Sequence, residues 1–254
     1  AWTPTDDQPQ SFLDGLPGAQ VREDAMLLAD FSTLPGFEAI GETTHYASKV
    51  FVSEQDPSKR LTVIMANRLP LEQQTGADLV YFNEAYRSFV LVQYKAMEKR
   101  DDEMEFRWQA KDQFCDEIDR MESLLAELRR LPSGQQPDGF RFSDNPFFLK
   151  FCPRVVFNPD DKGLFKGIYL PLDLWKRADA AGCFTGKRGG KVLTFDNVGR
   201  RINNSEFVGL VAGSWVGTSI EQSAVLGELV RKVLETGKTV TIAIKHASDT
   251  AGRR

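Results

Sequence analysis

The sequence DLVYFNEAYRSFVLVQYK, residues 78–95, contains two apolar runs joined by a polar stretch. The two runs, 78–82 and 89–95, are rich in the β-branched and aromatic residues that favour strands. The polar stretch between them, 83–88, has the composition of a connecting loop. This segment therefore predicts two antiparallel strands in close succession.

The register of this hairpin decides which side chains share one face of the sheet. If Asn83 lies opposite Ser88, then Asp78 lies opposite Gln93, with their Cβ atoms about 4.5–5.5 Å apart. Lys95 follows Gln93 by two residues, so strand alternation places it on the same side. We therefore expect a carboxylate, an amide oxygen and an ammonium group to converge at one end of the hairpin.

Further helices and strands are expected on both sides of the hairpin. Apolar residues at helical spacing, together with capping residues, predict helices over 22–34, 108–131, 172–180 and 219–236. Shorter apolar or alternating runs predict strands at 46–52, 61–66, 147–151, 154–157, 167–170 and 239–245. Interleaved strands and helices predict an α/β or α+β fold, with a central mixed sheet flanked by helices.

The helix expected at 108–131 has an apolar stripe typical of a core helix. The residues that form the stripe are Phe114, Ile118, Met121, Leu125 and Leu128. The many charged residues around the stripe are interpreted as a solvated helix face.

Composition bounds the class of protein. The 254 residues are 41% hydrophobic and 27% charged, as in globular chains, and the net charge of -4 disfavours coating nucleic acid by bulk charge. The longest apolar stretch, 208–217, falls far short of the roughly 20 residues that span a bilayer. We therefore expect no membrane association.

Because the sequence starts at Ala1 without a leader pattern, we expect a trimmed chain or a piece of a longer polypeptide.

Cysteine and histidine usage excludes several kinds of site. The 3 cysteines form no CxxC pair, which disfavours a disulfide framework and a cysteine-rich zinc site and favours a reducing, cytoplasmic compartment. The 2 histidines, His45 and His246, are too few and too far apart for an HExxH zinc hydrolase.

The residues expected at the end of the hairpin suit metal-assisted chemistry. The carboxylate of Asp78 and the amide oxygen of Gln93 are hard ligands of the kind that Mg²⁺ takes. Lys95 could orient or deprotonate an attacking water and offset charge on a phosphorane. Glu72, shortly before the first strand, could supply a second carboxylate. These groups point to hydrolysis of a phosphodiester.

Two short motifs in this region resemble the PD-(D/E)xK nuclease superfamily. They are Gly76-Ala77-Asp78 at the start of one strand and Gln93-Tyr94-Lys95 at the end of the next. More narrowly, the motifs resemble those of the Mrr-like restriction endonucleases, in which Gln replaces the usual acid. The resemblance covers about residues 20–157 and implies a core made of a helix, a three-stranded meander, a second helix and a further strand.

The resemblance also implies roles for residues. It implies Asp78 and Gln93 as ligands of Mg²⁺ or Mn²⁺, with the carbonyl of Tyr94 assisting and Lys95 as catalytic base or stabiliser. Two features depart from the family pattern: Gln93 is not acidic, and no proline precedes Asp78. The neutral Gln93 implies weaker metal binding.

The function implied is cleavage of DNA, with RNA not excluded, in a bacterial restriction or antiphage defence system. One alternative is a catalytically weakened module that binds nucleic acid or a partner protein. A second is a structural or assembly subunit, as a homo-oligomer or within a larger complex. A third leaves the hairpin purely structural, with Gln93 and Lys95 as surface residues.

A second candidate feature is the glycine-rich segment 182–201, which contains several cations and Asp196 as its only acid. Such a loop suits contact with a phosphate backbone. The residues expected to bind nucleic acid are Lys187, Arg188, Lys191, Arg200 and Arg201. The plainer interpretation is a solvated surface loop.

The chain is expected to divide into three parts. They are an N-terminal arm at 1–20, a nuclease-like core at 21–157 and a C-terminal α/β extension at 158–254.

Overall fold

The computed structural model describes residues 23–43, 47–132, 134, 136–154, 163–186 and 188–240. The described strands form a single mixed sheet. They are β1 (Phe37–Thr43), β2 (Ser48–Ser53), β3 (Arg60–Met65), β4 (Leu79–Asn83), β5 (Ser88–Arg100), β6 (Glu103–Trp108), β7 (Phe147–Pro153), β8 (Ile168–Pro171) and β9 (Lys191–Thr194). The helices are α1 (Glu23–Ser32), α2 (Pro70–Thr75), α3 (Gln113–Leu128), the 3₁₀ turn η2 (Pro137–Gly139), α4 (Leu172–Ala180), α5 (Asn204–Ala212) and α6 (Ile220–Thr236).

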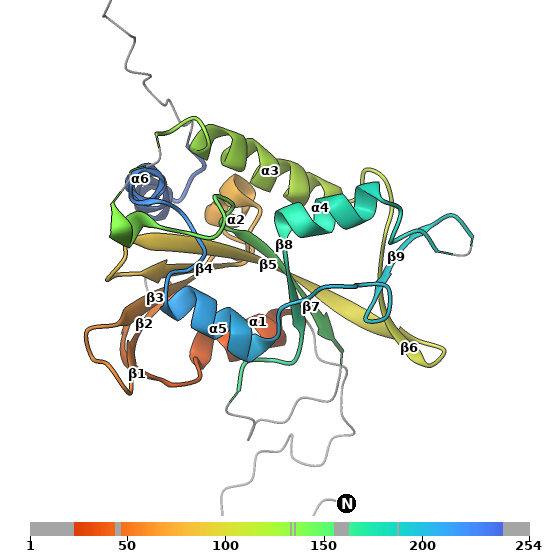
Figure 1. The fold of residues 1–254 in the computed structure, drawn as a ribbon, viewed down its shortest axis with the longest axis horizontal. Helices are drawn as coiled ribbons and strands as arrows, with labels where there is room; N and C mark the ends of the chain where they lie inside the picture. Colours follow the sequence, from red (N-terminus) through yellow and green to blue (C-terminus); the bar gives the residue numbers. More distant parts are fainter. Residues whose placement is uncertain are drawn as a thin grey trace, which may run out of the picture.

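Strand β5 organises the sheet because its 13 residues serve two groups of partners. Its first part pairs antiparallel with β4 and parallel with β7, and β8 completes that edge. Its last residues pair with β6, which in turn pairs with β9. We call 98–100 of β5, together with β6 and β9, the strand arm. Figure 1 shows β6 and β9 beyond the end of the main sheet.

The main sheet has a helical layer on each face. Helices α3, α4 and α6 lie on one face, and α1 and α5 lie on the other (Figure 1). Alternate residues of β5 follow this division: Leu91 packs in the core beneath α3, and Val92 packs in the core beside α1. The fold is therefore mixed α/β with a central mixed sheet flanked by helices, as expected.

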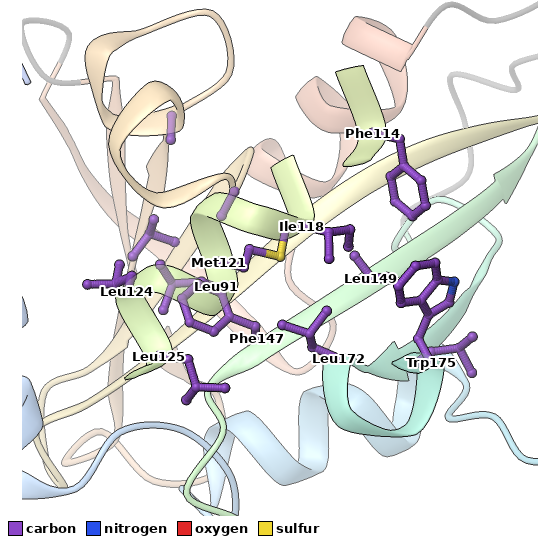
Figure 2. Close-up of a cluster of buried hydrophobic side chains, with 14 of the residues drawn as sticks. Leu91, Phe114, Ile118, Met121, Leu124, Leu125, Phe147, Leu149, Leu172 and Trp175 are labelled. Atoms are coloured by element: carbon purple, nitrogen blue, oxygen red, sulfur yellow. The ribbon is translucent and has the colours of Figure 1, made fainter. Parts of the chain in front are cut away.

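The apolar stripe expected on the long helix is confirmed. All of its residues are buried, including Phe114 and Leu128 at its two ends. Figure 2 shows α3 side chains directed at Leu91 and Phe147 of the sheet, with Leu172 and Trp175 of α4 closing the cluster. This packing holds α3 against the face that carries Gln93 and Lys95.

The prediction of a helix from residue 108 was wrong at its start. Residues 103–108 form β6, and α3 begins only at Gln113. Asp112 fixes this boundary, because its side chain accepts a hydrogen bond from the Cys115 N–H (3.1 Å) as an N-cap. The helix expected at 172–180 is confirmed, and so is the helix start at Ser219, where Ser219 and Gln222 form a capping box.

Besides the 3₁₀ turn η2, five elements were not expected from the sequence: β1, α2, β6, β9 and α5. The segments 154–157 and 239–245 lie largely outside the described residues. Residues after 163 contribute two strands to the same sheet, β8 on β7 and β9 on β6. None of the described helices is long and apolar enough to cross a membrane.

Candidate active site

The hairpin register expected from the sequence is confirmed. Asn83 pairs with Ser88, and Leu79 pairs with Val92. Asp78 directly precedes this ladder, and its N–H donates to the Val92 carbonyl (2.9 Å). The strand order thus brings Asp78 beside the stretch of β5 that carries Gln93.

Asp78, Gln93 and Lys95 share the α3 face of the sheet. Their alternate neighbours Val80 and Leu91 belong to the core beneath α3. Gln93 is only 2% exposed, and the Lys95 side chain is 12% exposed. The interpretation of these two as mere surface residues is therefore wrong.

Hydrogen bonds from the neighbouring strand and loop fix Asp78 in place. Its Oδ2 accepts from the Tyr94 N–H at 2.7 Å, and its carbonyl accepts from the Ala66 N–H at 2.7 Å. Burial raises the pKa of Asp78 well above its usual range, although Lys95 and the Tyr94 N–H act in the opposite direction. A buried carboxyl of this kind gains stability from a nearby cation.

Gln93 has one amide atom bonded and one without a partner. Its Nε2 donates to the Tyr94 carbonyl at 3.4 Å, so this carbonyl, expected to assist a metal, accepts from the amide. Among the described residues, the buried Oε1 of Gln93 has no hydrogen-bond partner. A buried acceptor without a partner costs about 1–3 kcal/mol. This oxygen is a free acceptor for a cation or a donor group.

Lys95 forms an ion pair that the sequence did not reveal. Its Nζ lies 2.6 Å from Oε2 of Glu117, a buried residue of α3. Glu117 follows Phe114 by three residues and precedes Met121 by four, so it lies on the apolar face of the helix. That spacing places Glu117 on the buried face of the helix, but it does not identify Lys95 as its partner. We call Asp78, Gln93, Lys95 and Glu117 the Lys95 cluster.

Gly76 allows α3 to come close enough to form this cluster. Its φ of +72° is in the left-handed region, and it ends α2. A Cβ at this position would lie 2.5 Å from the Glu117 carbonyl oxygen. Glycine is thus required both by the turn and by the approach of the α3 backbone.

Two further carboxylates surround the cluster. Burial raises the pKa of Glu23, at the start of α1, and its strongest charge interaction is with Lys95. Glu72 lies in the first turn of α2, where its side chain accepts from the Arg68 N–H. Its charge adds to the factors that raise the pKa of Asp78 and of Glu117.

A cleft of about 390 Å³ opens beside Lys95. Of the cluster, Lys95 alone lines this cleft, and Glu23 joins it from α1. The cleft's other walls come largely from the strand arm, the start of α3 and the segment after β7. They carry both charges and aromatic rings: Arg100, Arg107, Arg154, Glu98, Glu105, Asp112, Phe106 and Phe114.

The glycine-rich basic segment contains β9 and so supplies one strand of the strand arm. Lys191 begins β9 and pairs with Trp108 of β6. Its ammonium is hydrogen-bonded to Asp179 of α4, an acid that lies outside the segment 182–201. Arg188, Arg200 and Arg201 are exposed, and Lys187 lies outside the described residues.

The donor atoms of the cluster fit a hard divalent cation. The part of the chain that the structure describes contains no group of three or more His, Cys, Asp or Glu side chains that could hold a metal ion. The available donors are the Asp78 carboxylate and the unpartnered Gln93 oxygen, and Mg²⁺ commonly keeps several waters besides one or two carboxylates. The same donors suit Mn²⁺.

Searches against protein-family models, curated proteins and solved structures give no match to this chain.

Proposed function

We propose that this chain is a metal-dependent nuclease that hydrolyses phosphodiester bonds of DNA. The observation that carries the proposal is the convergence of Asp78, Gln93 and Lys95 on one face of the sheet, next to an open cleft. Buried charged groups with an unpartnered acceptor, beside a cleft, are typical of functional sites.

The order of the elements supports the proposal. Helix α1, the meander β3–β4–β5, helix α3 and strand β7 follow one another in the order that the PD-(D/E)xK resemblance implies. Strands β5 and β7 run parallel, and each neighbouring pair within the meander is antiparallel. The resemblance extends the proposal to a bacterial restriction or antiphage defence system.

Each residue of the cluster has a proposed role. Asp78 and the Gln93 oxygen would hold Mg²⁺ or Mn²⁺. A bound ion of this kind polarises a phosphoryl oxygen and lowers the pKa of a coordinated water. Glu117 orients Lys95 through their ion pair.

Lys95 acts as a cation in this proposal and not as a base. Burial alone would lower the pKa of Lys95, but Glu117, Glu23 and Asp78 together raise it above its ordinary value. The ammonium therefore keeps its proton at neutral pH. Its contribution is to stabilise negative charge that develops on the phosphate during hydrolysis.

The experiment is a nuclease assay on plasmid and oligonucleotide DNA with Mg²⁺, with Mn²⁺ and with a chelator. We expect cleavage with either ion and none with the chelator. Asp78→Asn and Lys95→Ala should each lose cleavage, while Lys99→Ala, an exposed lysine on the same strand, should not. Cleavage by folded Asp78→Asn at the wild-type rate would contradict the site.

One observation favours a second candidate, a nuclease-fold module that binds nucleic acid or a partner without cutting. The ammonium of Lys95 is already paired with Glu117. The proposed metal ligands also include only one carboxylate, that of Asp78. This candidate predicts salt-dependent DNA binding with no cleavage under any metal condition.

A further inference from the structure

We infer that the DNA segment bound at the cleft beside Lys95 is single-stranded. This inference rests on the proposed function and specifies its substrate. It comes from the depth of the Lys95 cluster and from the walls of the cleft.

The cluster is recessed from the molecular surface. Asp78 is 3% exposed, Gln93 2% and Glu117 1%. Of this cluster, Lys95 alone lines the cleft, so we take the cleft as the route by which a phosphate approaches these groups. Duplex DNA is stiff, with a persistence length of about 150 base pairs, so bending its backbone into a narrow recess is costly. A flexible single strand has no such barrier.

The size of the cleft also favours a single strand. Its volume of about 390 Å³ is near the lower end of the roughly 300–1,000 Å³ range of small-ligand pockets. A space of this size suits a short unpaired segment and not a double helix.

An aromatic ring on the cleft wall offers a surface for an unpaired base. Phe106 of β6 is half-buried and lines the cleft. Its ring is fixed by neighbouring rings, with centroids 5.0 Å from Phe114 and 5.4 Å from Phe151. Bases of single-stranded nucleic acid stack on such rings, whereas the bases of a duplex are already stacked on each other.

Arginines on the same walls suit a phosphate backbone. Arg107 follows Phe106 directly and makes two hydrogen bonds to Glu105, through Nε (2.7 Å) and Nη2 (2.8 Å). A guanidinium has five N–H donors, so others remain for a phosphate. Arg154 also lines the cleft, and its Nη1 lies 3.5 Å from Oε1 of Glu98. The cleft thus combines a ring on which a base could stack with cations that could contact phosphates, the two features of single-strand binding grooves.

The first test measures binding without divalent metal. A labelled oligonucleotide and its duplex are titrated with the full chain in chelator, and fluorescence anisotropy is followed. We expect the single strand to bind at least tenfold more tightly than the duplex. With Mg²⁺ added, we expect the single strand to be cut faster than the duplex.

Variants place the binding in the cleft. Phe106→Leu keeps apolar bulk but removes the ring, and should weaken single-strand binding about tenfold. Arg107→Ala should lower the salt slope of single-strand binding by less than about 0.7, because Glu105 already neutralises part of the guanidinium charge. Arg231→Ala removes the same charge from an exposed position of α6 that lies outside the cleft. This variant should bind as the wild type does. Circular dichroism checks that each variant is folded.

The outcomes separate this inference from the proposed function. Equal binding and cutting of duplex and single strand would overturn the inference and leave the nuclease proposal intact. Single-strand preference with the expected variant effects but no cleavage would support the inference and count against the nuclease. Wild-type binding by both Phe106→Leu and Arg107→Ala would overturn it, as would absence of DNA binding.

Discussion

The two faces of the central sheet each carry a buried lysine–carboxylate pair, and the two pairs differ in their surroundings. On the α3 face, Lys95 pairs with Glu117 next to the cleft. On the α1 face, Lys150 pairs with Asp30, and both side chains are completely enclosed. The same chemical pair therefore occurs once at an opening and once in a closed core.

The enclosed pair has its charges fully matched. Asp30 accepts from Lys150, from the Tyr94 hydroxyl (2.7 Å) and from the Phe165 N–H. Lys150 also lies over the rings of Tyr94 and Tyr169. A buried charge that is paired and hydrogen-bonded in this way has a structural role.

The pair at the cleft is different because groups beside it are not satisfied. Gln93 Oε1 has no partner among the described residues, and three neighbouring carboxyls, Asp78, Glu117 and Glu23, have raised pKa values because of burial. The enclosed side has unpartnered atoms too, the hydroxyls of Tyr81 and Tyr169, and these are neutral like the Gln93 amide. The comparison teaches that the additional buried carboxyls, more than burial itself or an unpartnered neutral atom, distinguish the candidate site.

The largest effect is expected at the enclosed pair. Lys150→Met leaves Asp30 as an uncompensated buried charge, which should lower the free energy of unfolding by about 3–5 kcal/mol. Urea denaturation measures this loss. The double variant Asp30→Leu/Lys150→Met removes both charges and should recover much of the stability. A loss below about 1 kcal/mol in the single variant would contradict the structural role of the pair.

Breaking the pair at the cleft should affect activity more than stability. In Lys95→Met, water in the adjacent cleft can reach the site, and the raised pKa of Glu117 lets that carboxyl take up a proton. The variant should therefore unfold at a higher urea concentration than Lys150→Met. Its cleavage rate should fall by about 10²–10³, as when one electrostatic stabiliser is removed. Equal destabilisation by the two variants would erase the distinction between the faces.

The sequence predicted the surroundings of Lys95 better than those of Lys150, for a physical reason. The β4–β5 register follows from strand alternation and loop length, so Asp78, Gln93 and Lys95 could be placed together. Glu117 could not, because it is one acid among many on a charged helix, and its contact depends on the approach of α3 to Gly76. Local pattern does not encode that approach.

The enclosed pair was beyond sequence reasoning altogether. Lys150 lies in the middle of an apolar run that was correctly expected to be a strand. Its partner Asp30 is 120 residues away, and the two meet only because α1 packs on the face that β7 joins. For the same reason the sequence did not show that Lys191 is neutralised by Asp179.

Gln93 offers a smaller and more specific test of the open face. Gln93→Glu should keep or tighten Mg²⁺ binding, because an anionic ligand attracts the cation more strongly than an amide does. Gln93→Leu, which lacks an oxygen donor, should lose both binding and cleavage. Isothermal titration calorimetry with Mg²⁺ or Mn²⁺ gives the affinities. Similar affinities for the two variants would place Gln93 outside the metal site.

The pH dependence of stability should also come from the open face. Burial raises the pKa of Asp78 above its value in the unfolded chain, so the folded state binds the extra proton between these two values. In chelator, this contribution to stability is complete below the unfolded pKa and is lost as pH rises through the folded pKa. Asp78→Asn, which does not titrate, should flatten the profile measured by urea denaturation. An unchanged profile would mean that Asp78 is not the group responsible.

The smallest effect is expected from the basic segment that contains β9. Arg188→Ala and Arg200→Ala should each lower the salt slope of DNA binding by about 0.7–0.9 if each contacts one phosphate. Lys191→Ala should change it less, because Asp179 already neutralises the ammonium. Turnover of bound substrate should stay close to the wild type. Slopes unchanged in all three variants would identify the segment as a surface loop.

The parallel pairing of β5 with β7 affects how the chain folds during synthesis. The hairpin partner β4 is already present when β5 leaves the ribosome, but β7 follows only after β6 and α3 have been made. Until then, the other edge of β5 presents unpaired backbone groups along residues 91–97, most of which are apolar. An open apolar edge of this kind is a template for aggregation. A nascent chain that stalls before Phe147 thus lacks the strand that covers its own central edge.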